Sequence, residues 1–235
     1  MKKCIGILFI SLVLLTFNLQ AQDNYKRFHF GPKIGLSATD IRYKDLQYDE
    51  YQFINDTIAY TNVMFSISAG LAIDYSIIPT KNYGMSIQTA LIYSRKGCTL
   101  FTESIDEPSE SINVMMHYLD IPVELRAKCH IAKRNYLVLG FGPTFNIGIS
   151  QVNDITEYRS DEPNKKHTNN LQFGEGDRDN GLHRLDIGAN AILGIESTGG
   201  FRFDLSYYIP LRNLSIDTSK TVKHFVFAAS VGYMF

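Results

Sequence analysis

Eight stretches of this chain alternate between apolar side chains and polar or small ones, and this pattern constrains the fold most strongly. In residues 224–235, Phe225 and Phe227 fall on one face, and His224 and Ser230 fall on the other. Successive side chains of a β-strand point to opposite faces, so a period of two predicts strands with one apolar face. The other stretches are residues 28–38, 65–75, 85–94, 119–128, 136–147, 184–196 and 201–207.

Short and long connections alternate between these stretches. The short ones lie at residues 78–83, 131–135 and 198–200, and the long ones at 39–62, 98–114, 150–182 and 211–222. An even strand number with short turns at one end and long loops at the other is typical of bacterial outer-membrane barrels. The sequence therefore predicts an all-β fold, an eight-stranded antiparallel transmembrane β-barrel with short periplasmic turns and long extracellular loops.

Alternation alone does not say which face points inward, and a soluble lipocalin-like barrel would bury the apolar face. The polar faces carry charges of both signs in near balance, interleaved with Gly and Ser. An eight-stranded barrel is just wide enough inside for side chains, so paired charges would fill a narrow lumen. The predicted lumen charge network consists of Lys33, Asp74, Asp120, Glu124, Arg126, Arg184, Asp186, Arg202 and Asp204.

The N-terminal segment has the features of an export signal. Residues 1–21 combine two lysines, a short apolar run and a small residue, Ala21, which predicts a cleaved signal peptide. Residues 22–235 would then form one barrel domain with a net charge of −3 (21 Lys and Arg minus 24 Asp and Glu), which argues against nucleic-acid binding.

The two cysteines of this domain are Cys98 and Cys129. They fall near opposite ends of the expected barrel, so we expect two free thiols.

Three motifs carry a family resemblance. They are residues 30–37 (FGPKIGLS), 118–126 (YLDIPVELR) and 202–208 (RFDLSYY). The chain resembles the PorT-like outer-membrane β-barrel proteins of Bacteroides-type Gram-negative bacteria. This resemblance covers essentially the whole mature chain and implies the barrel, but it carries no catalytic residue. PorT itself belongs to a protein-secretion machine, so the resemblance also raises that role.

Motifs for catalysis or metal binding are absent from the sequence. The acidic loop at residues 175–181 fails the EF-hand pattern, because Asn180 occupies the position of the required Gly. No histidine spacing typical of zinc sites and no Gly-x-Ser-x-Gly motif occurs. His29, Asp120 and a serine could meet in space, but a barrel brings many polar residues together by geometry alone. We therefore expect no enzyme activity, no cofactor and no metal.

The terminal strand predicts the partners used in assembly. Its aromatic and apolar residues resemble the signal that the outer-membrane insertion machinery reads; they are Phe225, Phe227, Val231, Tyr233 and Phe235. Other expected partners are outer-membrane lipid, lipopolysaccharide and an envelope or extracellular protein.

The charges of the expected loops suggest roles. Residues 98–114 contain four acidic residues and no Lys or Arg. The leading hypothesis is a non-enzymatic surface protein for interaction or adhesion, or an envelope-structural protein. A subunit of a type IX secretion or other envelope machine is the alternative, and a small pore is a third.

Overall fold

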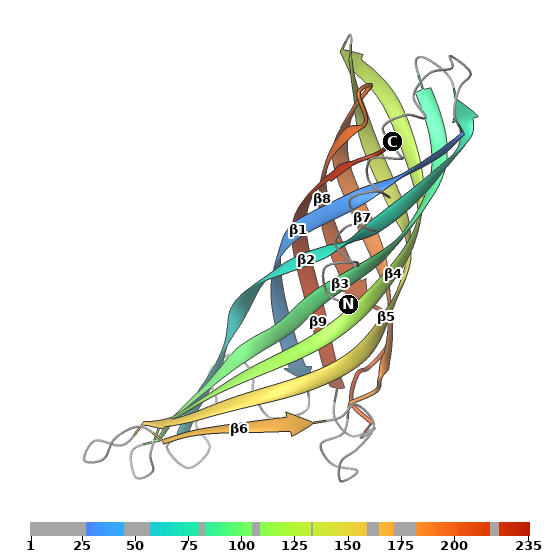
Figure 1. The fold of residues 1–235 in the computed structure, drawn as a ribbon. Coiled ribbons are helices and arrows are strands. Elements are labelled where there is room, and N and C mark those ends of the chain that lie inside the picture. Colours follow the sequence, from blue (N-terminus) through green and yellow to red (C-terminus); the bar gives the residue numbers. More distant parts are fainter. Residues whose placement is uncertain are drawn as a thin grey trace, which may run out of the picture.

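The chain folds into long antiparallel strands wound around one axis (Figure 1). The computed structural model describes residues 27–44, 57–79, 83–104, 109–132, 134–158, 165–171, 182–216 and 221–235. The predicted signal peptide and the acidic loop 175–181 lie outside these residues. The strands are β1 (Phe28–Lys44), β2 (Thr57–Pro79), β3 (Tyr83–Ser104), β4 (Ser109–Ala132), β5 (Asn135–Tyr158), β6 (Lys165–Leu171), β7 (Leu185–Ser197), β8 (Phe201–Pro210) and β9 (Thr221–Tyr233). The described residues contain no helix that could cross a membrane.

Eight of these strands close into a ring. Each strand from β1 to β5 pairs with the next, β5 pairs with β7, and β7, β8 and β9 follow in order. The ring closes where β9 pairs with β1, from Lys33↔Gly232 to Lys44↔Thr221. Strand β6 stands outside the ring and pairs with the outer end of β5. The predicted eight-stranded antiparallel barrel is confirmed, and its closed hydrogen bonding is what lets strands lie in lipid.

The apolar face of the strands points outward. Leu36, Phe65 and Leu71 are 66%, 79% and 63% exposed, whereas Asp74 and Arg126 on the opposite face are fully buried. Because large apolar side chains cover the outer surface, the ring suits a hydrocarbon environment and the lipocalin-like alternative is wrong. Cys98, which is buried, and Cys129, which is exposed, form no disulfide with each other, as expected.

Four strands are much longer than a membrane requires. Strands β2, β3, β4 and β5 contain 23, 22, 24 and 24 residues, whereas about 9–11 residues cross a bilayer. Their outer ends swing together to one side of the barrel, where β6 lies beside β5 (Figure 1). The expected loop at 98–114 is therefore mostly strand, because β3 runs to Ser104 and β4 starts at Ser109.

The inner face changes character in these outer segments. Beyond the polar lumen, seven buried residues form an apolar cluster inside the barrel: Ile41, Cys98, Val114, Met116, Tyr118, Leu214 and Val222. Leu214 comes from the segment between β8 and β9, which an isolated bridge from Ser215 holds to Leu182. The outer end of the barrel therefore has an apolar core, as a water-soluble β-barrel does. In these outer segments the apolar side chains point inward, so a pattern of outward-facing apolar residues does not identify them as strands.

Candidate functional site

A ladder of ion pairs crosses the lumen near the short turns. Lys128 Nζ of β4 lies 3.0 Å from Asp74 Oδ2 of β2 and 3.0 Å from Glu196 Oε2 of β7. Arg202 of β8 donates to Asp74, and its Nε lies 2.9 Å from Glu196 Oε2. Because each buried charge has at least two opposite charges as neighbours, the cost of removing it from water is offset.

Gln88 of β3 connects this ladder to a second set of charges. Its side-chain oxygen accepts hydrogen bonds from Arg202 Nη1, at 2.6 Å, and from Arg126 Nη1. Arg126 also donates to Asp204 Oδ1, and Asp204 Oδ2 lies 3.0 Å from Lys33 Nζ of β1. The contacts run without a break from Glu196 to Lys33 and involve six of the eight barrel strands, so side chains occupy this part of the lumen.

One member of the predicted network, Arg184, has a backbone partner in place of an ion pair with the other described members. Arg184 lies one residue before β7, is exposed, and its Nε donates to the carbonyl oxygen of Gly148 at 3.1 Å. Alternation fixes the direction of a side chain only within a strand, and β7 begins at Leu185. The Arg184 charge therefore lies beside the outer end of β7, apart from the ion pairs described above.

Lys96 takes a place in the lumen that the sequence analysis did not assign. It is 4% exposed, and its Nζ lies 2.9 Å from Asp120 Oδ1 while Ser94 Oγ donates to Asp120 Oδ2 at 2.6 Å. The ammonium also lies over the rings of Tyr118 and Tyr208, at 4.8 and 5.3 Å from their centroids. Lys96 lies two residues after Ser94 on the same inner face of β3. A predicted strand that continued from residue 94 to residue 96 would have included it in the lumen.

Asp186 and His224 lie beside this lysine cluster and are fully buried. Asp186 Oδ2 accepts hydrogen bonds from Asn146 Nδ2, at 2.8 Å, and from the Tyr208 hydroxyl. His224 stacks on Tyr208 with ring centroids 5.1 Å apart, and its Nε2 lies 3.4 Å from Asp186 Oδ2. Neutral donors therefore hold this carboxylate, in contrast to the ion pairs of the ladder.

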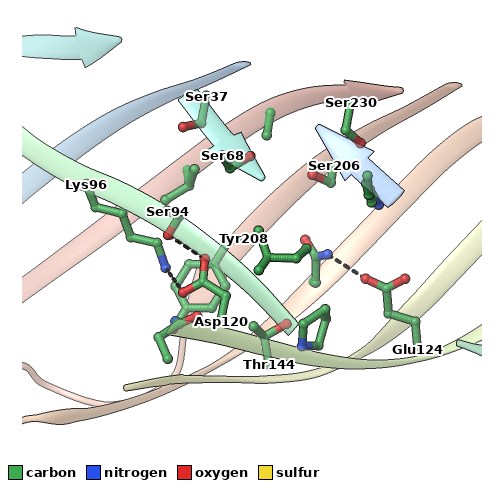
Figure 2. A pocket seen from close by; sticks show the side chains of 17 residues that line it. Ser37, Ser68, Ser94, Lys96, Asp120, Glu124, Thr144, Ser206, Tyr208 and Ser230 are labelled. Atoms are coloured by element: carbon green, nitrogen blue, oxygen red, sulfur yellow. Dashed lines mark hydrogen bonds and ion pairs between the residues drawn. The ribbon is translucent and has the colours of Figure 1, made fainter. Parts of the chain in front are cut away.

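A polar chamber of about 90 Å³ lies between the ladder and the outer cluster. Figure 2 shows Lys96, Ser94 and Asp120 on one side of it and Glu124 on the opposite side, where Asn190 Nδ2 donates to Glu124 Oε1 at 2.9 Å. Hydroxyl groups on the wall come from Ser37, Ser68, Thr144, Ser206, Tyr208 and Ser230, and apolar side chains, among them Ile92, Pro122 and Val226, line it as well. The interior is thus a stack of an ion-pair ladder, a hydrophilic chamber and an apolar cluster.

The structure does not bring the candidate catalytic residues together. His29 is paired in the strand register with Asp74, at the ladder end, whereas Asp120 contacts Lys96 and Ser94 on the far side of the chamber. Among the described residues, no group of three or more His, Cys, Asp or Glu side chains is placed to hold a metal ion.

The terminal strand helps to close the barrel. Phe227 and Val231 are exposed on the lipid-facing side, and Phe225 and Tyr233 are partly exposed. The backbone N–H of Phe235 donates to the carbonyl oxygen of Phe30 in β1 at 2.9 Å, and the two phenyl rings lie 5.9 Å apart. The role of these residues as an assembly signal stays a prediction.

The closed ring, the apolar belt and the side-chain-filled lumen define an integral β-barrel of a Gram-negative outer membrane. The chain belongs to the family described as outer membrane protein beta-barrel domain, whose sequence profile matches residues 20–215. A comparison with curated proteins found no match.

Several solved outer-membrane barrels are similar to this chain. The attachment invasion locus protein Ail of Yersinia pestis is 13% identical, with 88% of this chain and 98% of Ail covered and a TM-score of 0.36. OprG of Pseudomonas aeruginosa is 12% identical, with 90% and 98% covered and a TM-score of 0.43. Neisserial surface protein A is 12% identical, with 89% and 98% covered and a TM-score of 0.39.

Proposed function

We propose that this protein is a non-enzymatic surface-recognition barrel whose outer strand segments, rather than its lumen, contact the partner. The observation that carries this proposal is the length of β2 to β5, at 22–24 residues each. About 9–11 residues cross the bilayer, so half of each strand is available to build a sheet outside it. A sheet of paired strands is a more rigid platform for binding than a loop of the same length.

The outer segments also have a distinctive charge. The sequence from 98 to 114, which connects β3 to β4, contains Glu103, Asp106, Glu107 and Glu110 and no Lys or Arg. Opposite charges speed encounter and select partners, so the acidic connection between β3 and β4 favours a basic protein surface or lipopolysaccharide bridged by divalent cations. We propose these as the outward partners, with outer-membrane lipid around the belt and the insertion machinery during assembly.

A pore is the function that the lumen supports least. We expect no stable ion conductance from the purified barrel in a planar lipid bilayer, because the ladder from Glu196 to Lys33 and the outer apolar cluster both occupy the axis. Single-channel recording in symmetric potassium chloride checks this. Discrete openings of uniform size would contradict the prediction and make transport the better proposal.

A subunit role in a secretion or envelope machine is the second candidate. The motifs at residues 30–37, 118–126 and 202–208 favour it, since they resemble PorT-like barrels. In that case we expect the binding surface at the periplasmic end, which includes the short turn at Arg134 and the other short turns.

A pull-down with two variants distinguishes these candidates. In one variant, a two-residue turn replaces residues 153–170, which removes β6 and the outer end of β5 with which it pairs. In the other, Arg134→Ala changes the periplasmic turn. The tagged barrels are captured from native outer membranes in gentle detergent, and bound proteins are identified by mass spectrometry.

If the protein is a surface-recognition barrel, the trimmed variant should lose its partner while still migrating as a folded barrel. Arg134→Ala should retain that partner. Stoichiometric recovery of the same periplasmic or secretion proteins with the trimmed variant would overturn the proposal in favour of a machine subunit.

A further inference from the structure

The lipid-facing side chains of β3 and β4 end at the same level of the barrel. On β3 they run from Tyr83, which is 65% exposed, to Tyr93, which is 44% exposed. This segment has eleven residues, and about 9–11 residues cross a bilayer, with aromatic side chains at both interfaces. Tyr93 pairs with Leu119 of β4, and the next outward pair is Arg95 with His117. Arg95 and His117 therefore lie at the level of the outer lipid headgroups.

Both of these side chains point out of the barrel. Their chain neighbours are the inward residues, since Lys96 is 4% exposed and Met116 and Tyr118 are 1% and 0% exposed. Successive residues of a strand alternate between faces, so Arg95 and His117 share the outer face, where each is half-buried. Residues paired directly across two strands have Cβ atoms about 4.5–5.5 Å apart. The guanidinium and the imidazole can therefore contact the same small group.

His117 is held in place by Tyr93. The Tyr93 hydroxyl lies 2.5 Å from His117 Nδ1, and the two rings stack with centroids 5.9 Å apart. A neutral imidazole has one N–H and one acceptor nitrogen, so with the hydroxyl as donor the proton lies on Nε2. Within the described part of the chain, Nε2 has no hydrogen-bond acceptor. Its N–H is available to a group from outside the protein.

Arg95 has no carboxylate partner among the residues that the structure describes. Its charge contrasts with the cations of the lumen, such as Arg126 and Lys128, which pair with buried acids. A cation that the protein leaves unpaired at a membrane surface attracts anionic headgroups. The planar fork of a guanidinium matches two oxygens of a phosphate, which makes phosphate the preferred anion.

We propose that Arg95 and His117 bind a phosphate group of lipopolysaccharide in the outer leaflet. The guanidinium donates to two phosphate oxygens, and His117 Nε2–H donates to the same phosphate. The occupant is a lipid, because the lipid-facing side chains of Tyr93 and Leu119 border the site and suit the acyl chains below the phosphate. The contact is direct, unlike the cation-bridged contact of the acidic connection. It depends on the outer-membrane location and is independent of the recognition role proposed for the outer sheet.

Lipid A, the phosphorylated lipid anchor of lipopolysaccharide, is the probe for this site. The full barrel, folded in detergent with ¹⁵N-labelled histidine, is titrated with lipid A in EDTA, which removes bridging divalent cations. The Nε2 signal of His117, identified by its loss in His117→Gln, should shift until the site is saturated. Arg95→Gln should weaken binding about tenfold or more, because charge-assisted hydrogen bonds are lost. Arg134→Gln is the matched control at the periplasmic end and should bind lipid A like the wild-type protein.

Three results would overturn the proposal. One is equal weakening, or none, in Arg95→Gln and Arg134→Gln. Another is dephosphorylated lipid A that binds as tightly as lipid A. The third is an equal shift of the His117 signal with inorganic phosphate alone, which would identify a site for free anions. If Arg95→Gln does not fold, Arg95→Lys keeps the charge and removes the fork. This variant should bind lipid A several-fold more weakly, and unchanged binding would contradict the two-oxygen contact.

Discussion

Replacing Arg126 with methionine is expected to lower the free energy of unfolding by about 3–5 kcal/mol. The side chain is fully buried and donates to both Gln88 and Asp204. Methionine has similar length but no charge, so Asp204 would keep only Lys33 as a cationic partner in a site closed to water. Gln88 would retain only the bond from Arg202. Urea titration of the folded barrel in detergent, followed by circular dichroism, measures the change.

Arg184→Met is the control for the same chemical change. Arg184 is exposed and makes one hydrogen bond to a backbone oxygen, so its loss should change the free energy of unfolding by about 0.5 kcal/mol or less. Equal losses from Arg126→Met and Arg184→Met would show that the ion-pair ladder contributes nothing specific to stability.

Replacing Gly31 with alanine is expected to reduce the yield of folded barrel, at a cost of about 3 kcal/mol or more. A Cβ at Gly31 would lie 1.7 Å from the carbonyl oxygen of Tyr233, which is backbone and has little freedom to move. Gly31 lies beside the seam where the first and last strands meet, next to the Phe235–Phe30 hydrogen bond. The fraction that migrates as a folded barrel in unheated gel electrophoresis measures the effect.

Gly199→Ala is the matched control for this change. Gly199 lies in a periplasmic turn, where the nearest atom to an added Cβ is Ser197 Oγ at 3.8 Å. The folded fraction of this variant should stay at the wild-type level. Normal folding of Gly31→Ala would mean that the seam can separate without loss of the barrel.

Much of the membrane-spanning part could be predicted, because each strand carries its own local pattern. Phe65 and Leu71 point to lipid and Asp74 points inward for the same reason, a side-chain period of two. The outer halves of β3 and β4 could not be predicted in this way. Past Lys96 the inward positions become apolar, as at Cys98 and Val114. The alternation of outward apolar and inward polar side chains, which identified the membrane-spanning segments, therefore no longer applies there.

The sequence by itself determined the number of barrel strands, the lipid-facing belt and the direction of the charged side chains, of both signs, toward the lumen. These properties depend on neighbouring residues within one strand. Only the tertiary structure decided which charges pair, because Lys128 meets Asp74 and Glu196 across 54 and 68 residues of chain when the ring closes. Ring closure also places Gln88 between Arg126 and Arg202, and it leaves the guanidinium of Arg184 bonded to the carbonyl oxygen of Gly148. Long-range register sets these contacts, and no local pattern encodes it.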